Sequence, residues 1–428
     1  MSDYTQMWSD LGLDLKGHDA LLSVLGSAYQ DIFLSQKNRP EGMKYFDFVM
    51  SEVHGLRIKE LMDAKAQGRI VVGSYCVFVP EELILAVDGV SVGLCADAEF
   101  NFEGAEEVIP RNLCPLIKSA FGFKRGLVCP YLEASDIVVG ENTCDGKKKM
   151  VELITDLKPT YIMDLPQVPD EAEAVANWTV MIRKLQRFLE ATFEVKATDD
   201  EIEAAIRDIN LRNAMMREVF EFAALRPSVV SWREMYDLTF LAQGSSGKEM
   251  EPVLAEALKK LEERRDSGYA YRPAGTPRVM VTGCPVGGDA EKVFRIIEEA
   301  GGVIVVLDAC SGFKPYMTDT VQGTGDPVRA LAQRYLAIPC SCMTPNTRRL
   351  TEITRLIDTF KPDAVIDVVL QACHSFNIES HKVGEYVQKN HGLPFLKIVT
   401  DFSLSDEEQV RTRIEALLES CFVQNISH

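Results

Sequence analysis

Cysteines occupy one recurring kind of place in this sequence, where an apolar strand-like run ends and a helix start follows. The stretch GRIVVGSYCVFVPEELILA, residues 68–86, places Cys76 between a β-branched run and the helix-start signals of Pro80, Glu81 and Glu82. In an open α/β sheet, ligands bind at the carboxyl ends of the strands. Taken alone, Cys76 is better explained by packing, because a free thiol behaves as a small hydrophobe.

A second copy of the pattern makes packing a poorer explanation. The stretch PRVMVTGCPVGGDAEKVFRIIEEAGG, residues 277–302, repeats the strand, the cysteine and the helix. Six cysteines at such positions pair between the two halves in the same order: Cys76 with Cys284, Cys114 with Cys340, and Cys144 with Cys373. Cys95 and Cys310 pair as well and are reserve ligands, whereas Cys129, Cys342 and Cys421 are interpreted as packing thiols. If the halves face each other, the six thiols converge on one cleft.

Converging thiols favour an iron–sulfur site over zinc. Zinc sites typically use short CxxC-type spacing, which this chain lacks, and only Cys340 and Cys342 lie close together in the sequence. Soft thiolates select iron–sulfur clusters, whose ligands need only converge in space. Six cysteines exceed the four of one ordinary cluster, so they suit two cubanes with three protein ligands each.

The repeat predicts an α/β fold with two pseudo-symmetric, doubly wound parallel-sheet (Rossmann-like) domains. Each half alternates strand and helix patterns, and a strand followed by Asp164 or Asp401 closes each repeat. The predicted division is a helical segment over 1–68, a cluster-binding domain over 69–167, a helical bridge and linker over 168–272, and a second cluster-binding domain over 273–428.

Composition limits the class of protein and its partners. The 428 residues are 46% hydrophobic and 26% charged, as in globular proteins. A formal net charge of -18 argues against nucleic acid as a partner, because phosphates attract Lys and Arg. The sequence shows neither a secretory segment nor an apolar run that could span a membrane, so we expect a cytoplasmic protein. Disulfides are rare there, and the 11 cysteines therefore point to metal binding, catalysis or burial.

Polar residues beside the cysteines supply candidate proton carriers and anion contacts. His374 follows Cys373 and can deliver a proton, although a structural imidazole is the plainer explanation. Glu81 and Glu82 are explained by the helix start, and a carboxylate beside a reducing cluster can also relay protons. CDGKKKM, residues 144–150, offers three lysines that offset cluster charge, recruit an acidic partner or form a solvated face. CPVGGDA, residues 284–290, is a glycine-rich stretch that can cradle an anion at the helix N-terminus, and it is better explained as backbone that wraps a cluster closely.

These motifs resemble the 2-hydroxyacyl-CoA dehydratase and benzoyl-CoA reductase superfamily. The resemblance rests on YCVFVPEELILA, NLCPLIKSAFG, NTCDGKKKM, VTGCPVGG, RYLAIPC and LQACHSFNIES, and it covers roughly residues 70–165 and 278–401. Within that group the chain is most similar to the double-cubane cluster proteins. The resemblance implies one trio of cluster ligands, Cys76, Cys114 and Cys373, and a counterpart trio, Cys144, Cys284 and Cys340. It further implies a bridging sulfide between two [4Fe–4S] units, which gives an [8Fe–9S] cluster.

The resemblance also implies partners and an activity. It implies a homodimeric, ATP-dependent low-potential oxidoreductase that takes electrons from a separate, dimeric iron–sulfur ATPase and reduces a small substrate. ATP is then used by that partner, and this chain agrees, since GSSGKE at 244–249 lacks phosphate-loop spacing and is interpreted as a flexible turn. Two alternatives stay open: a 2-hydroxyacyl-CoA dehydratase-type subunit with one [4Fe–4S] cluster, and a non-enzymatic electron carrier.

Overall fold

Two four-stranded parallel sheets form the centre of the protein. The computed structural model describes residues 4–35, 48, 51–52, 54–94 and 96–426. The strand orders are β2-β1-β3-β4 and β6-β5-β7-β8, so the second sheet repeats the first. The strands are β1 Val71–Ser74, β2 Val90–Gly93, β3 Ile137–Glu141, β4 Thr160–Met163, β5 Arg278–Gly283, β6 Val303–Asp308, β7 Ala364–Leu370 and β8 Phe395–Thr400. This topology confirms the predicted pair of Rossmann-like domains.

Four of the strands are buried along their whole length because helices cover the sheet faces. Every residue of β3, β5, β6 and β7 is buried, as their β-branched runs predict for parallel strands. The helices of the first half are α5 Glu81–Ala86, α6 Phe102–Glu106, α7 Pro115–Arg125, α8 Pro130–Ala134 and α9 Asp145–Ile154. Those of the second are η3 Gly288–Glu291, α14 Lys292–Glu299, η4 Lys314–Tyr316, α15 Pro327–Leu336, α16 Thr347–Phe360, α17 His374–His391 and α18 Glu407–Ile426.

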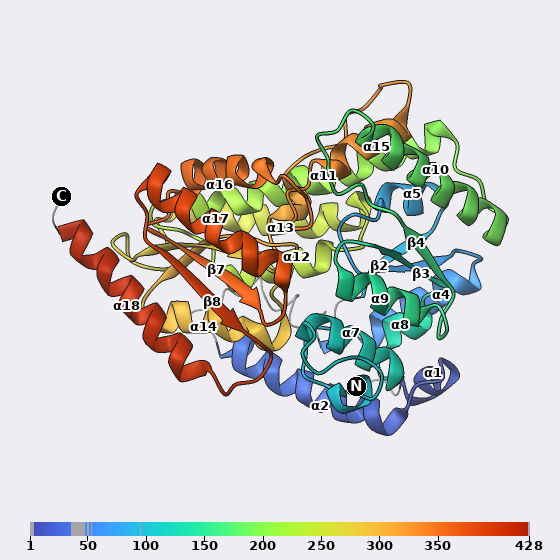
Figure 1. Ribbon diagram of the computed structural model, residues 1–428, viewed down its shortest axis with the longest axis horizontal. Helices are drawn as coiled ribbons and strands as arrows, with labels where there is room; N and C mark the ends of the chain where they lie inside the picture. The colour runs from blue at the N-terminus through green and yellow to red at the C-terminus, as the bar shows by residue number, and fades with distance from the viewer. Residues whose placement is uncertain (1–3, 36–47, 49–50, 53, 95, 427–428) are drawn as a thin grey trace.

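Further helices precede and join the two halves. Before the first sheet lie α1 Thr5–Asp10, α2 Leu15–Tyr29, η1 Gln30–Leu34 and α4 Leu56–Ala66. Between the halves lie α10 Ala174–Phe193, α11 Asp199–Ala224, α12 Trp232–Ala242 and α13 Gly247–Asp266. The long α11 contacts α5 of the first half and α15 and α16 of the second, so it ties both together (Figure 1). The predicted domain boundaries themselves stay a prediction.

Part of the predicted turn at 244–249 is a helix start instead. Gly244 has a positive φ of 75° and makes the turn, but α13 begins at Gly247. Ser246 accepts a hydrogen bond from the backbone N–H of Glu249, and the Glu249 side chain bonds back to the backbone of Ser246. This capping box satisfies amides that the turn would leave free.

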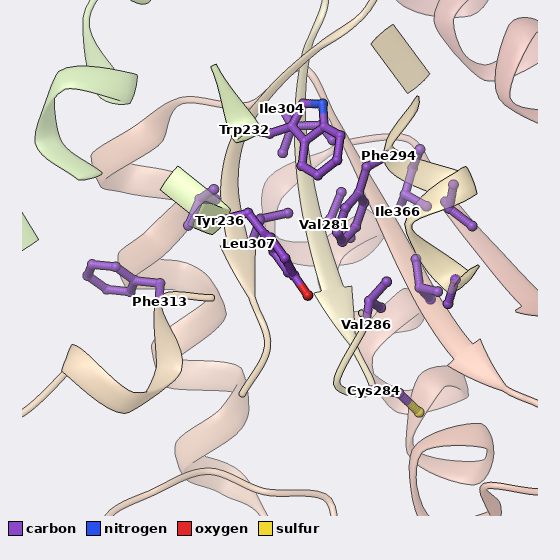
Figure 2. Close-up of a cluster of buried hydrophobic side chains, with 14 of the residues drawn as sticks. Trp232, Tyr236, Val281, Cys284, Val286, Phe294, Ile304, Leu307, Phe313 and Ile366 are labelled. Atoms are coloured by element: carbon purple, nitrogen blue, oxygen red, sulfur yellow. The ribbon is translucent and has the colours of Figure 1, made fainter. Parts of the chain in front are cut away.

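An apolar cluster packs against β5. Trp232 packs edge-on against Phe294, with ring centroids 5.0 Å apart, beside Ile304 of β6. Figure 2 shows Cys284 at the end of β5, below these rings. The apolar core therefore anchors β5, and the last residues of this strand lie at the carboxyl end of the sheet. Within the part of the chain that the structure describes, no helix has the length and apolar character needed to cross a membrane.

Candidate metal centre

The six predicted cysteines lie in loops at the same ends of the two sheets. The three pairs are equivalent in topology: Cys76 and Cys284 follow β1 and β5, Cys144 and Cys373 follow β3 and β7, and Cys114 and Cys340 precede α7 and α16. Three of them, Cys114, Cys144 and Cys373, are the N-cap residues of α7, α9 and α17. A helix N-terminus carries a partial positive charge and so favours a thiolate.

Cys373 brings cysteines of both halves together. Its thiol is hydrogen-bonded to Cys114 of the first half and to Cys284 of the second. The bond with Cys114 lowers the pKa of Cys373. The bond with Cys284 and burial raise this pKa by more, so its net shift is upward. The backbone N–H of Leu370 also points at the Cys284 sulfur, at 3.4 Å. Cys373 therefore contacts one thiol of the first half and one of the second.

A second set of thiols adjoins the first. Cys340 is hydrogen-bonded to Cys342, and both Cys310 and Cys340 act electrostatically on Cys76. Cys144 interacts electrostatically with both Cys114 and Cys340, so it links the two sets. All six predicted cysteines, together with the reserve ligand Cys310, therefore belong to one cysteine group. Which cysteine belongs to which cubane stays a prediction. The contacts join Cys373 both to Cys114, of its own predicted trio, and to Cys284, of the other trio, and they place Cys310 and Cys340 near Cys76.

The remaining cysteines have different surroundings. Cys95 lies outside the described residues. Cys129 packs into an apolar cluster beside α8, and Cys421 donates to the carbonyl of Leu417 within α18, as expected of packing thiols. Cys342 packs against the apolar cluster beside β1 and β3, as expected of a packing thiol, and it also contacts Cys340. Its closeness to Cys340 in the sequence was the only signal that could have revealed this.

Burial and thiol contacts set the charges within the cysteine group. Burial raises the pKa of Cys76 well above its ordinary value and that of Cys310 to about 11. The hydrogen bond from Cys342 lowers the pKa of Cys340 to about 6. Cys340 is therefore the thiol most ready to become a thiolate, which is the form that binds metals. A cation would draw the other thiols to the same state.

Three buried cations surround the cysteine group. Lys147 forms an ion pair with Glu141 and acts on Cys76 and Cys144. Lys314 and Arg349, exposed by only 2% and 1%, belong to the second half and act on Cys340 of the same half. Of the three lysines in CDGKKKM, Lys147 is the buried one. Lys148 also interacts with Cys144 but is exposed and paired with Asp145, and Lys149 forms an exposed pair with Glu152.

Lys314 and Arg349 share carboxylates that do not satisfy them fully. Asp308 Oδ1 lies 3.5 Å from Lys314 Nζ, and Asp308 Oδ2 lies 3.6 Å from Arg349 Nη1. Glu379 Oε2 lies 3.1 Å from Arg349 Nε. Among the described residues, Lys314 Nζ has no hydrogen-bond partner at all. Buried charges are normally paired and hydrogen-bonded, so this ammonium has capacity left for an anionic group beside the thiols.

The donor set fits an iron–sulfur cluster better than a single metal ion. Within the described residues, no three His, Cys, Asp or Glu side chains converge as they would around one ion. In a cluster each thiolate binds its own iron, so the ligands spread more widely. Clustered thiols, helix N-termini and partly unsatisfied buried cations all suit an anionic iron–sulfur group.

The predicted proton carriers lie at different depths. His374 is exposed at the start of α17. Glu82 is fully buried and accepts hydrogen bonds from the hydroxyls of Tyr335 and Thr320, at 2.7 and 3.2 Å. Glu81 pairs with Arg212 at 2.6 Å. Both glutamates thus join the first half to helices outside it, and their role as proton relays stays a prediction.

Comparisons with known proteins agree with this architecture. The family model for the 2-hydroxyglutaryl-CoA dehydratase D-component matches residues 76–421. The chain is 38% identical over 370 residues to YjiM of Escherichia coli (strain K12), described as a candidate dehydratase subunit; the match covers 86% of this chain and 96% of that protein. It is 23% identical to the (R)-phenyllactyl-CoA dehydratase beta subunit of Clostridium sporogenes, over 82% of this chain and 92% of that subunit. The extent of these matches shows that the chain belongs to the 2-hydroxyglutaryl-CoA dehydratase D-component family.

Proposed function

We propose that this chain is a low-potential reductase whose six cysteines hold an [8Fe–9S] double-cubane cluster. A separate, dimeric iron–sulfur ATPase supplies the electrons, and a small molecule is reduced. Membership of a dehydratase family supports an enzymatic role. The observation that carries the finer proposal is the meeting of Cys373 with Cys114 and Cys284, because it joins thiols of both halves.

The cofactor and the protein contribute separately to this function. When bound, such a cluster supplies single electrons at a potential set by its charge, its hydrogen bonds and its exposure. The chain supplies six thiolates, helix N-termini and the buried cations Lys147, Lys314 and Arg349. Their positive charge favours the thiolate ligands.

The proposed partners follow from the same argument. ATP hydrolysis belongs to the partner ATPase, since GSSGKE starts a capped helix after α12 and does not follow a strand as a phosphate loop does. The equivalent halves provide a complete ligand set within one chain, and we propose that two such chains form a homodimer.

A second candidate function is a dehydratase-type subunit with one [4Fe–4S] cluster. The names of the relatives favour it, since (R)-phenyllactyl-CoA dehydratase and lactoyl-CoA dehydratase both have beta subunits that resemble this chain. On this alternative, only one trio of cysteines would hold iron. The remaining cysteines of the group would be free thiols.

Iron and acid-labile sulfide, measured on protein purified without oxygen, separate the two functions. We expect about eight irons per chain and a loss of iron in both Cys144→Ala and Cys284→Ala. Cys421→Ala is the matched control, because this buried thiol lies in α18, away from the group. About four irons, unchanged in one of the two variants, would favour the dehydratase-type subunit. Absence of iron would refute both.

A further inference from the structure

A small cavity lies beside the cysteine group. Its wall includes Val77, the residue after Cys76, and Gln243, whose side-chain amide donates to the carbonyl of Cys310 at 3.1 Å. Arg212 of α11 and Arg334 of α15 line it from helices that lie between and within the halves. The cavity thus lies where both halves meet. One lining residue, Val77, is next to Cys76 in the sequence, and another, Gln243, is hydrogen-bonded to Cys310.

The charges that line the cavity do not cancel. Glu81 accepts a hydrogen bond from Arg212 at 2.6 Å, so this pair is neutral. Arg334 is buried, and its guanidinium donates only to the backbone carbonyls of Pro315 and Thr318 while stacking 4.3 Å from the centre of the Tyr335 ring. No carboxylate pairs with it within the described part of the chain. One positive charge therefore remains at a buried wall.

The second arginine adds an unused donor. Arg212 is 3% exposed, and its Nη1 is fully occupied by Glu81 and the carbonyls of Ala242 and Ser245. Its Nε has no hydrogen-bond partner among the residues that the structure describes. A buried donor without an acceptor is unfavourable. An acceptor atom in the cavity would relieve this.

The free volume limits the size of what can bind. It is about 20 Å³. A water molecule needs about 10–15 Å³, so the cavity has room for about one or two waters or a molecule of about three heavy atoms.

We propose that this cavity binds a small monoanion of the carboxylate or oxoanion class. Arg334 supplies the matching charge and Arg212 a further donor. Glu81 competes with the anion for Arg212. That the anion is the reductase's substrate rests on the proposed function, because Val77 of the cavity wall follows Cys76 in the sequence and Gln243 is hydrogen-bonded to the Cys310 carbonyl. That the anion binds rests only on the cavity.

Formate tests the proposal, because it has one negative charge and three heavy atoms. Calorimetric titration of the iron-loaded protein in chloride-free buffer should give saturable binding of formate, and weaker or no binding of neutral formamide. Arg334→Gln should weaken formate binding at least tenfold. Arg329→Gln is the matched control, since Arg329 lies on the same helix but is exposed. It should leave binding unchanged.

A second variant, Glu81→Gln, tests the proposal independently if Arg334→Gln does not fold. Glu81→Gln should tighten formate binding about tenfold, because it releases Arg212 from its carboxylate. Absence of saturable binding in both wild type and Glu81→Gln would overturn the proposal. So would binding that ignores both substitutions, or equal binding of formamide. Iron measured in the same samples separates the two conclusions: about eight irons without formate binding refutes the cavity alone, whereas formate binding without iron refutes the reductase alone.

Discussion

At the scale of single residues, the cysteine group depends on cations that the chain buries beside it. Lys147 is 9% exposed and its partner Glu141 is fully buried. Removing one member of such a pair leaves an uncompensated charge in the interior, which typically destabilises a protein by about 3–5 kcal/mol. Here the uncompensated charge would be negative and would also act on the thiol of Cys76.

Lys147→Met should therefore weaken both the fold and the hold on iron. We expect a lower midpoint of thermal unfolding and faster iron loss to a chelator, measured without oxygen. Lys148→Met is the control, because Lys148 is the next residue but forms an exposed pair with Asp145. Exposed pairs contribute about 0–1 kcal/mol. Equal effects of the two substitutions would contradict this role for Lys147.

A buried carboxyl outside the cysteine group should make stability depend on pH. Burial raises the pKa of Glu291 to about 8. Tyr236 and the backbone N–H of Gly288 bond to it and lower the pKa, whereas Asp237 and Asp97 raise it. Because the folded-state pKa is above the unfolded value, the folded protein keeps a proton that the unfolded chain loses. Its stabilising contribution is complete at low pH and is lost as the pH rises towards about 8.

Glu291→Gln removes this titration and should flatten the profile. Unfolding midpoints of wild type should fall from pH 6 to pH 9 more steeply than those of the variant. Glu299→Gln is the control, since Glu299 is partly exposed and arginines lower its pKa. A wild-type profile parallel to that of Glu291→Gln would show that Glu291 does not titrate in this range.

At the scale of elements, strand ends set the positions of the thiols. Gly283 is the last residue of β5 and has a φ of 124°, and an added Cβ would lie 2.0 Å from the carbonyl oxygen of Val368. That backbone belongs to β7 and cannot move without disturbing the sheet. Only glycine therefore fits beside β7 at this position, and this fit places the next residue, Cys284, in the cysteine group.

Gly283→Ala should consequently displace Cys284 and reduce the iron content of the purified protein. Gly301→Ala is a matched control: Gly301 also has a positive φ, 93°, but an added Cβ would meet no atom within 4 Å. The control isolates steric displacement from backbone strain. If both variants lost iron equally, strain alone would explain the effect.

The same elements explain what could be predicted from the sequence. β-Branched runs that end at cysteines fixed the strands, and their repetition predicted both sheets and the equivalent positions of Cys76 and Cys284. Arg349 and Lys314 could not be predicted to join the site. They lie on α16 and on the short helix η4. The approach of these helices to the thiols depends on packing between distant segments, which no local pattern records.

At the scale of the whole molecule, a bound cluster would couple the two halves. Cys114 comes from the first half, and Cys284 and Cys373 come from the second, so iron bound to them would bridge both. A group that binds only the folded state stabilises it, and thiolate–metal bonds add directly to folding free energy. Without it, the buried cations Lys147, Lys314 and Arg349 would lose an anionic neighbour.

Iron removal should therefore lower the thermal stability of the entire chain. For a protein of this size, about 1 kcal/mol corresponds to about 2 °C, so a cluster that contributes several kcal/mol should shift the midpoint by about 5 °C or more. Anaerobic unfolding followed by circular dichroism, before and after chelation, measures this shift. Cys421→Ala should show the full shift, because its thiol lies apart from the group, whereas Cys284→Ala should show a smaller one. Equal midpoints with and without iron would mean that the halves are held together by α11 and its packing alone.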